Sequence, residues 1–599
     1  MPISSISKKR SAIIAASFLA ALLITAAAIC HFNRNENLDF EKYTHDLFCQ
    51  EVSGNTISLH YTLKNPSAYG IADASVSLGS YCTDTASACA ALENAIVVLQ
   101  SYDRNKLSEE NRLTYDILND YYENALALAP YALYEEPLSP LTGTQSQLPV
   151  VLSEYHFYNT SDIDTYLELL TKVPEYFQSV LQFENVRAKA GLFMSEDALD
   201  QLTEECIAFT KLGEDNYLYT SFEERLNSLE NELNGKSLPS SDRKKYIKKN
   251  KKYMKEYIFP AYQSLADGLE ALRGSCSTSS KPGGLCNLPN GKRYYELVAA
   301  SETGSARSIP KLQELARRQI VEDLGDMQAA LAKRGIQDSS ENADSASSDL
   351  FASQGTVLED SNPVSILASL ENKMQGDFPE PPAVDVQVKY VQKSLEEYLS
   401  PAFYMIPALD NTENNVIYIN AGHIPDDLSL FTTLAHEGYP GHLYQNVYYM
   451  NQSPNPIRCL LDYGGYTEGW ATYSEMLSYY YAPIEKEDAT IMQKNTSILL
   501  GLYALADMGI HYDGWTLAET IDFFSDYGIS DSAAISEIYQ LIASDPANYL
   551  KYYIGYLEFL ELKKYAIEKW GSDFSQERFH RTVLETGPAP FAILRKQVE

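Results

Sequence analysis

Helical periodicity constrains the fold of this chain more than any other feature of its sequence. Between Leu107 and about Leu272, apolar residues recur every three or four positions, as in Thr165–Val173 and Glu223–Leu233. This spacing places the apolar side chains on one face of a helix, which must be buried against other helices. Residues 309–334 repeat the pattern. We therefore predict a mainly α protein.

Length and charge restrict the class of protein further. The chain has 599 residues, 45% of them hydrophobic, which is enough for a large core. A length of this order predicts roughly three or four domains, or one large helical body with two lobes. The net charge of −34 disfavours nucleic acid and anionic lipid as partners. We expect no nucleic-acid partner, and contact with a membrane only through the N-terminal segment.

The N-terminus has the residue pattern of a targeting signal. The basic run Lys8–Arg10 precedes an uncharged apolar stretch from Ser11 to about Phe32. Such a segment is typical of a signal peptide or of a single span with its N-terminus inside the cell. Ala26–Ala28 would allow cleavage, whereas Ile29 before Cys30 is too bulky for a good lipidation signal. We favour an uncleaved anchor, formed by residues 1–33, rather than a cleaved signal peptide. Either alternative places the remaining chain at the outer face of the cell membrane or in the secreted fraction.

Cysteines are too few for a disulfide scaffold, since the chain has eight. In an exported protein, the closely spaced pairs Cys82–Cys89 and Cys276–Cys286 are candidates for local disulfide bonds. The sequence contains no Cys-x-x-Cys motif, the spacing that would indicate a cysteine metal site.

Two short segments are the best strand candidates. Residues 402–406 and 415–420 are rich in aromatic and β-branched side chains, and the turn-forming residues 410–414 separate them. They predict a small hairpin. It could offer an edge to an extended substrate or could be a plain surface hairpin.

The segment Leu434–His442 contains the residues that indicate metal chemistry. His436 and Glu437 follow the apolar run 428–435, which suits a buried helix, and His442 follows a Pro-Gly step. Imidazole nitrogens bind zinc, and a neighbouring carboxylate can accept a proton from water that the metal activates. Histidines six residues apart lie on different sides of a continuous helix. Both can bind one ion only if the helix bulges or ends at Pro440–Gly441.

A third ligand is needed, and Glu468 is the candidate. It lies in the apolar and aromatic segment 466–475, 26 positions after His442. Glu475 follows seven residues later and therefore shares its helical face. The alternative is that Glu468 is a solvated carboxylate without a metal.

These segments and three later ones resemble a known family. The later segments are Asp507-x-Gly-x-His511, Pro546 ahead of Tyr552-x-x-Gly555, and Phe579-His580 before Gly587. Together they resemble the bacterial "domain of unknown function 885" family, whose hallmark is His-Glu-x-x-Pro-Gly-His followed by Glu-Gly-Trp-Ala. The resemblance covers roughly residues 105–597. The family is regarded as zinc-peptidase-like, with a mostly helical, cleft-bearing fold of the thimet-oligopeptidase and angiotensin-converting-enzyme class.

The resemblance implies a role for each site residue. His436, His442 and Glu468 would bind one Zn²⁺ ion, and Glu437 would act as the base. Tyr552 and His511 would face the oxyanion of the substrate. Three departures leave substrate preference open: Leu443 stands where many members have histidine, Ala547–Asn548 stands where Gly-Gln is usual, and an arginine expected a few residues before Asp507 is absent.

The expected architecture is a large two-lobed helical body with a deep cleft and a small hairpin near the metal helix. We divide the chain into the N-terminal segment 1–33, a helical region 34–335, a Ser- and Asp-rich insertion 336–363, and a metal-binding catalytic region 364–599.

Three functions fit this sequence. The first is an exported zinc metallopeptidase with a peptide or peptide-like substrate. The second is a metal-dependent amidase that acts on cell-wall or other non-standard amides. The third is a surface binding protein without catalysis, which would have no need of the base Glu437. The sequence does not separate the first two.

Overall fold

The computed structural model describes residues 35–72, 74–81, 83–140, 143–232, 238–276, 283–334, 361–391, 393, 396 and 400–599. The predicted anchor and nearly all of the predicted insertion lie outside these residues, as does Cys82. No helix among the described residues is long and apolar enough to cross a membrane.

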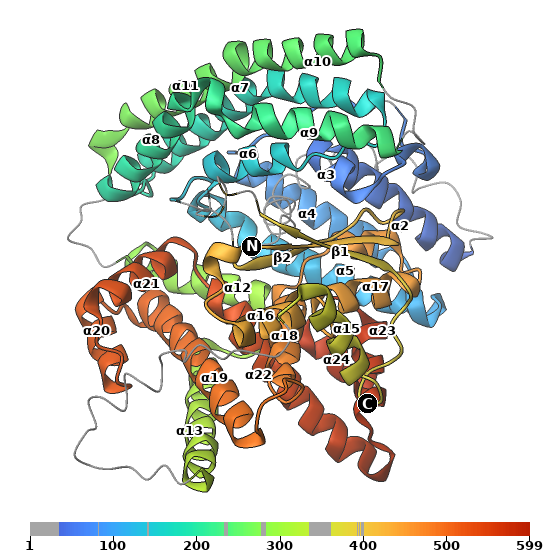
Figure 1. The fold of residues 1–599 in the computed structure, drawn as a ribbon, viewed down its shortest axis with the longest axis vertical. Helices are drawn as coiled ribbons and strands as arrows, with labels where there is room; N and C mark the ends of the chain where they lie inside the picture. The colour runs from blue at the N-terminus through green and yellow to red at the C-terminus, as the bar shows by residue number, and fades with distance from the viewer. Residues whose placement is uncertain are drawn as a thin grey trace.

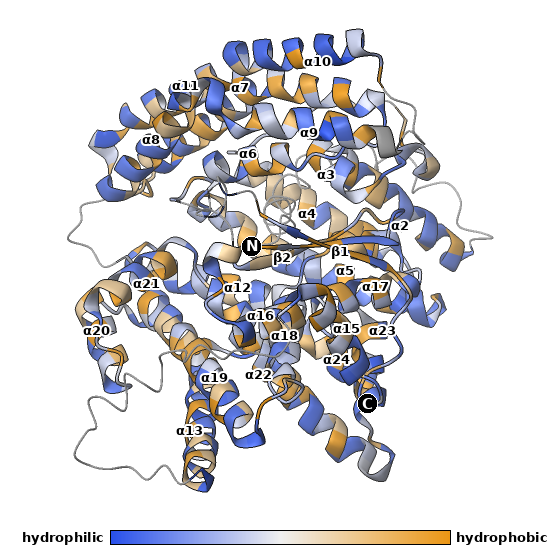
Figure 2. Ribbon diagram, in the orientation of Figure 1, coloured by the Kyte–Doolittle hydropathy of each residue, from blue (hydrophilic) through white to orange (hydrophobic). Residues whose placement is uncertain are grey.

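The protein is mainly α-helical, with one small sheet, as its periodicity predicts (Figure 1). Its helices form two lobes, each around its own hydrophobic core. The smaller lobe contains the helices α6 (Thr144–Ser153), α7 (Thr160–Lys189), α8 (Glu196–Lys211), α9 (Tyr217–Glu232), α10 (Ser240–Tyr253) and α11 (Phe259–Glu270). In Figure 2, hydrophilic and hydrophobic residues alternate along helices such as α7 and α8, whose apolar faces supply this core.

The larger lobe combines helices from both ends of the chain. Its N-terminal helices are α2 (Glu36–Ser53), α3 (Thr56–Thr62), α4 (Thr85–Gln100) and α5 (Glu109–Leu128). Its later helices are α12 (Gly291–Thr303), α13 (Ile309–Lys333), α15 (Pro363–Lys373), α16 (Asp427–Glu437), α17 (His442–Asn451), α18 (Gly464–Ser478), α19 (Lys486–Met508), α20 (Leu517–Asp526), α21 (Ser532–Ser544), α22 (Asn548–Trp570), α23 (Gln576–Thr586) and α24 (Phe591–Val598). The lobes therefore do not follow the division of the sequence into 34–335 and 364–599.

The sheet has the order β1-β3-β2. β2 (Ala402–Met405) and β3 (Asn414–Ile419) pair antiparallel, with Ala402 opposite Ile419, which confirms the predicted hairpin. β1 (Asp385–Tyr390) pairs parallel to β3 on its other side and was not predicted. Its sequence alternates polar and apolar residues, and Val386 and Val388 pack against the core of the larger lobe, but the run is short and mostly exposed. β2 remains at the edge of the sheet, beside the predicted metal helix α16.

The predicted Cys276–Cys286 disulfide is wrong, because both residues are free cysteines. Cys276 packs against the core of the smaller lobe. Cys286 belongs to the short helix η8 (Leu285–Asn287), and its thiol donates a hydrogen bond to the carbonyl of Ile510 in the larger lobe. Their attachment to different lobes keeps the two thiols from pairing.

Helices α18 and α22 approach each other unusually closely. A Cβ atom on Gly469 would lie 2.5 Å from the carbonyl carbon of Gly555, and one on Gly555 would collide with the carbonyl oxygen of Gly465. The two backbones can therefore touch only because these positions have no side chain. This contact places Glu468 of α18 near Tyr552 of α22.

We predict that Gly469→Ala destabilises the protein by about 1–3 kcal/mol or more, because the added methyl group must push two helices apart. Chemical denaturation followed by circular dichroism measures this change. Gly325→Ala is the matched control: Gly325 lies inside helix α13, and a Cβ there meets nothing within 4 Å. That substitution should be neutral or stabilising by up to about 1 kcal/mol. Equal effects of both substitutions would contradict the close-packing account.

Candidate metal centre

The turn between α16 and α17 solves the spacing problem of the two histidines. α16 ends at Glu437, and α17 begins at His442. A Cβ atom on Gly441 would collide with the carbonyl oxygen of His436, so only glycine allows the chain to fold back this tightly. The indole of Trp470 and the hydroxyl of Ser474 donate hydrogen bonds of 2.9 Å and 3.2 Å to the carbonyl of Pro440. These bonds fix the turn to α18, the helix that carries Glu468.

His436, His442 and Glu468 converge from three helices. The Nε2 atom of His442 lies 3.2 Å from Oε2 of Glu468, and Nε2 of His436 lies 3.7 Å from the same oxygen. The two imidazole rings are nearly perpendicular, at 81°, with centroids 4.9 Å apart. Ligands placed tetrahedrally at about 2.1 Å from one ion are roughly 3.4 Å from each other. The spacing of these three side chains therefore fits a zinc ion.

Glu475 supports His436 from behind. Its Oε2 atom lies 3.0 Å from Nδ1 of His436, the ring nitrogen on the far side from Glu468. A carboxylate in this position fixes the orientation of the ring, selects the tautomer that leaves Nε2 free for a metal, and increases the basicity of the ligand. The sequence offered a signal for this role, since Glu475 lies seven residues after Glu468 on one face of α18. Spacing alone could not show which histidine it contacts.

Glu437 lies at the edge of the cluster. One of its carboxylate oxygens accepts a hydrogen bond of 2.7 Å from the backbone amide of Tyr404 in β2. Donor atoms of His436, Glu437 and His442 all lie within 4.8 Å of one another, so Glu437 is a second candidate for the carboxylate ligand. We assign that role to Glu468, because its oxygen is closer to both imidazoles. The edge strand β2 thus fixes one carboxylate oxygen of Glu437, and the second oxygen remains available to accept a proton or a hydrogen bond.

Opposite charges hold the side chains of this cluster together. Burial alone would lower the pKa of the His436 imidazole, but its interactions with Glu468 and Glu475 outweigh burial and raise this pKa well above its ordinary value. Burial would raise the pKa of the Glu468 carboxyl, but His442 and His436 hold it well below its ordinary value. A metal must displace the proton of His436. The affinity for a metal should therefore fall as the pH falls.

Tyr552 completes the wall of a pocket of about 190 Å³ that His436, Glu437, His442, Glu468 and Glu475 also line. Its ring lies 6.3 Å from that of His436, at 25°. Burial, followed by the charges of Glu468 and Glu437, raises the pKa of Tyr552 well above its ordinary value, so it remains a hydrogen-bond donor. Its hydroxyl has no hydrogen-bond partner among the described residues and is available to a substrate.

The structure does not bring His511 to this pocket. His511 is fully buried in η12 (Gly509–Asp513), a turn of π-helix at the end of α19. Its Nδ1 accepts a hydrogen bond from the amide of Leu285 at 3.2 Å, and its Nε2 donates one to the carbonyl of Ile542 at 2.9 Å. Burial lowers its pKa to about 4, which keeps the ring neutral. Both ring nitrogens form hydrogen bonds with the backbone, so neither is available to stabilise an oxyanion.

Comparison with known proteins places the chain in a family. A family model described as "Bacterial protein of unknown function (DUF885)" matches residues 73–598. The chain belongs to this family. Among curated proteins, none matches the chain significantly.

Two solved structures share the fold. A protein of Colwellia psychrerythraea, described as a candidate lipoprotein, has 20% sequence identity and a TM-score of 0.78. A protein of Shewanella oneidensis, described as a candidate lipoprotein of unknown function, has 16% identity and a TM-score of 0.60. In both comparisons the match covers 93% of this chain and 98% of the other. The likeness therefore extends over both lobes.

We predict that Glu475→Gln weakens zinc binding by about 10–100-fold, because a neutral amide supports the His436 imidazole less well than a carboxylate does. Competition with a chelator of known affinity measures the change. Glu568→Gln, an exposed glutamate on α22, is the control and should leave the affinity unchanged. Unaltered zinc affinity in Glu475→Gln would show that Glu475 does not support a ligand.

Proposed function

We propose that this protein is an exported zinc-dependent peptidase that hydrolyses peptide bonds. The observation that carries the proposal is the convergence of His436, His442 and Glu468 beside Glu437 and Tyr552. Two imidazoles and one carboxylate are a usual ligand set of catalytic zinc, in which the fourth position stays open for water or substrate. Sites for magnesium or calcium are built mainly from oxygen ligands, so the two imidazoles favour zinc.

A zinc ion at this position would polarise the substrate carbonyl and lower the pKa of a water molecule to near 7. The protein's own groups perform the proton transfers. Glu437, held by the amide of Tyr404, accepts a proton from the attacking water through its second oxygen. It then delivers this proton to the nitrogen of the leaving amine. Tyr552 donates a hydrogen bond to the oxyanion that forms on the former carbonyl oxygen.

Two features favour a peptidase over the alternatives. A binding protein without catalysis has no need of a carboxylate fixed beside the ligands, yet Glu437 is held there by β2. A cavity of about 940 Å³ shares His442 and Glu468 with the small pocket. This volume is at the upper end of the range for small-molecule sites and suits several residues of a peptide.

The location of the protein belongs to the same proposal. The basic and apolar segment 1–33 would export the chain and retain it at the outer face of the membrane. Both structural relatives are described as candidate lipoproteins, which agrees with attachment through the N-terminus.

We predict that Glu437→Gln reduces peptide hydrolysis by about 10²–10⁴-fold and leaves zinc bound, because it removes the base but no ligand. Tyr552→Phe should reduce the rate by roughly a hundredfold, also with zinc retained, because it removes one oxyanion donor. Cleavage of a peptide library by the zinc-loaded protein, followed by mass spectrometry, measures both effects.

Tyr549→Phe is the matched control for the tyrosine, since Tyr549 lies one turn earlier on α22 and does not line the small pocket. It should leave the rate unchanged. Full activity of Glu437→Gln would rule out the proposed base. Cleavage of cell-wall stem peptides but of no ordinary peptide would replace the peptidase with an amidase.

A further inference from the structure

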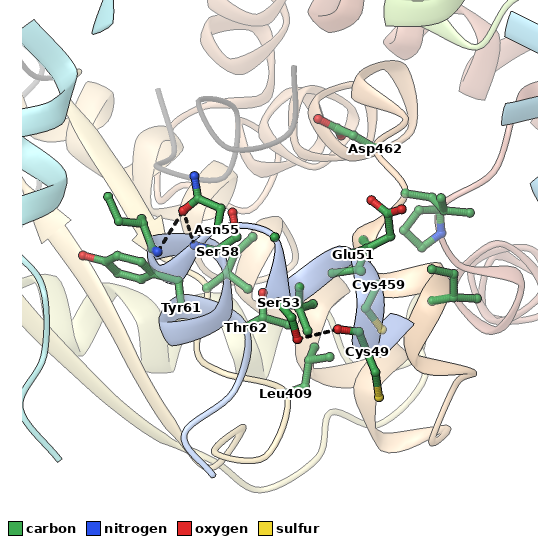
Figure 3. Close-up of a pocket in the computed structure, with 18 of the residues that line it drawn as sticks. Cys49, Glu51, Ser53, Asn55, Ser58, Tyr61, Thr62, Leu409, Cys459 and Asp462 are labelled. Carbon is green, nitrogen blue, oxygen red and sulfur yellow. Dashed lines mark hydrogen bonds between the residues drawn. The ribbon is translucent and has the colours of Figure 1, made fainter. Parts of the chain in front are cut away.

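The large cavity extends from the metal centre to the N-terminal helices. It begins at His442 and Glu468 and reaches α2 and α3, and Figure 3 shows residues of these two helices in its wall together with Leu409, Cys459 and Asp462. Three carboxylates outside the metal centre line it: Glu51, Glu302 and Asp462. The lining contains a single lysine, Lys551, and no arginine. Acidic side chains therefore outnumber basic ones on this wall.

Glu51 gives the strongest indication that a cation binds in this cavity. It lies on α2 in a partly buried position and exposes part of its surface to the cavity. Its carboxylate has no hydrogen bond and no ion pair with any described residue. Burial raises its pKa to about 7. A carboxylate at such a depth is costly to keep ionised without a positive partner, and the cavity is where a partner could enter.

Asp462 lies near Glu51. It lies two residues before the start of α18, and Figure 3 shows both side chains among those that line the cavity. Both carboxyl groups lie near Tyr121, since burial and then the charges of Glu51 and Asp462 raise the pKa of this tyrosine. Asp462 and Glu302, too, have no ion pair with any described residue.

Lys551 does not neutralise this region. Its charge contributes to the lowered pKa of Glu468, and its Nζ atom lies 5.5 Å from the centre of the Tyr552 ring. The stem of Lys551 also passes beside Gly464 and the Glu302 backbone, but its ammonium forms no ion pair with Glu51, Glu302 or Asp462 among the described residues. Within the described part of the chain, no other lysine and no arginine lines the cavity near these carboxylates.

The short sequence separation between Asp462 and Glu468 limits the distance from the cavity carboxylates to the metal centre. Between Asp462 and Glu468 lie Tyr463, outside α18, and four residues within it, so their Cα atoms lie at most about 13 Å apart. An extended peptide advances about 3.3 Å per residue and would cover this distance in roughly four residues.

We propose that Glu51 and Asp462, with Glu302 beside them, form a subsite for a cationic group of the substrate, within about four residues of the bond that is cleaved. The cation is an ammonium or guanidinium, supplied either by a basic side chain or by the peptide's amino terminus. This inference rests on the proposed peptidase function and adds the substrate class to it.

The test measures peptide binding to the zinc-loaded Glu437→Gln protein, which should not consume its ligand. The probes are fluorescent hexapeptides in which lysine replaces norleucine at each position in turn, with free or acetylated amino termini. We expect at least one cationic peptide to bind about tenfold more tightly than its neutral counterpart. Adding Glu51→Gln or Asp462→Asn should remove most of this advantage without changing the affinity for the neutral peptide. Glu322→Gln, an exposed glutamate on α13, is the control and should preserve the advantage.

The outcomes separate the two sources of the cation. Loss of the advantage on acetylation identifies the amino terminus, and loss on replacement of lysine by norleucine identifies a side chain. Equal binding of charged and neutral peptides to the Glu437→Gln protein would overturn the subsite, even if a cavity variant failed to fold. If the wild-type protein cleaved peptides without preferring a cation, the subsite would fall and the peptidase would stand. Selective binding without any cleavage would leave the subsite and remove the peptidase.

Discussion

The contact between α18 and α22 is the constraint on which the candidate site depends. Gly469 and Gly555 meet at the point where these helices cross, one residue after Glu468 and three residues after Tyr552. Any side chain at this crossing would separate the helices and move the carboxylate away from the tyrosine. Trp470 and Ser474, on the same helix as Glu468, also hold the Pro440 turn that positions the two histidines. One helix thus sets the position of every ligand.

The charges of the site follow from this packing. Three carboxylates, those of Glu437, Glu468 and Glu475, share a small pocket with two imidazoles. Without a metal, protonated imidazole balances part of this charge, as the raised pKa of His436 shows. A divalent cation together with Lys551 would balance the three carboxylates and leave both imidazoles neutral. Glu51, Asp462 and Glu302, which line the adjoining cavity, are not part of this balance, and the proposed subsite for a cation rests on them.

The sequence predicted the helical class, the hairpin and the segments that form the site, because helical periodicity and short motifs are local properties. The helix does end before His442, and His436, His442 and Glu468 converge. His511 shows why the remainder was out of reach: a lone histidine in a motif can serve a ligand or the backbone, and only its two buried partners decide between them. β1, Glu51 and the free thiols of Cys276 and Cys286 likewise depend on contacts between segments far apart in the chain.

The metal content of the purified protein tests the central claim most directly. Elemental analysis after dialysis against zinc and removal of loosely bound ions should give one zinc per chain in the wild type and much less in His436→Ala, His442→Ala and Glu468→Ala. Each of these variants removes one of the three ligands that a catalytic zinc site requires. A wild-type protein without stoichiometric metal, or zinc retained in full by all three variants, would contradict the account.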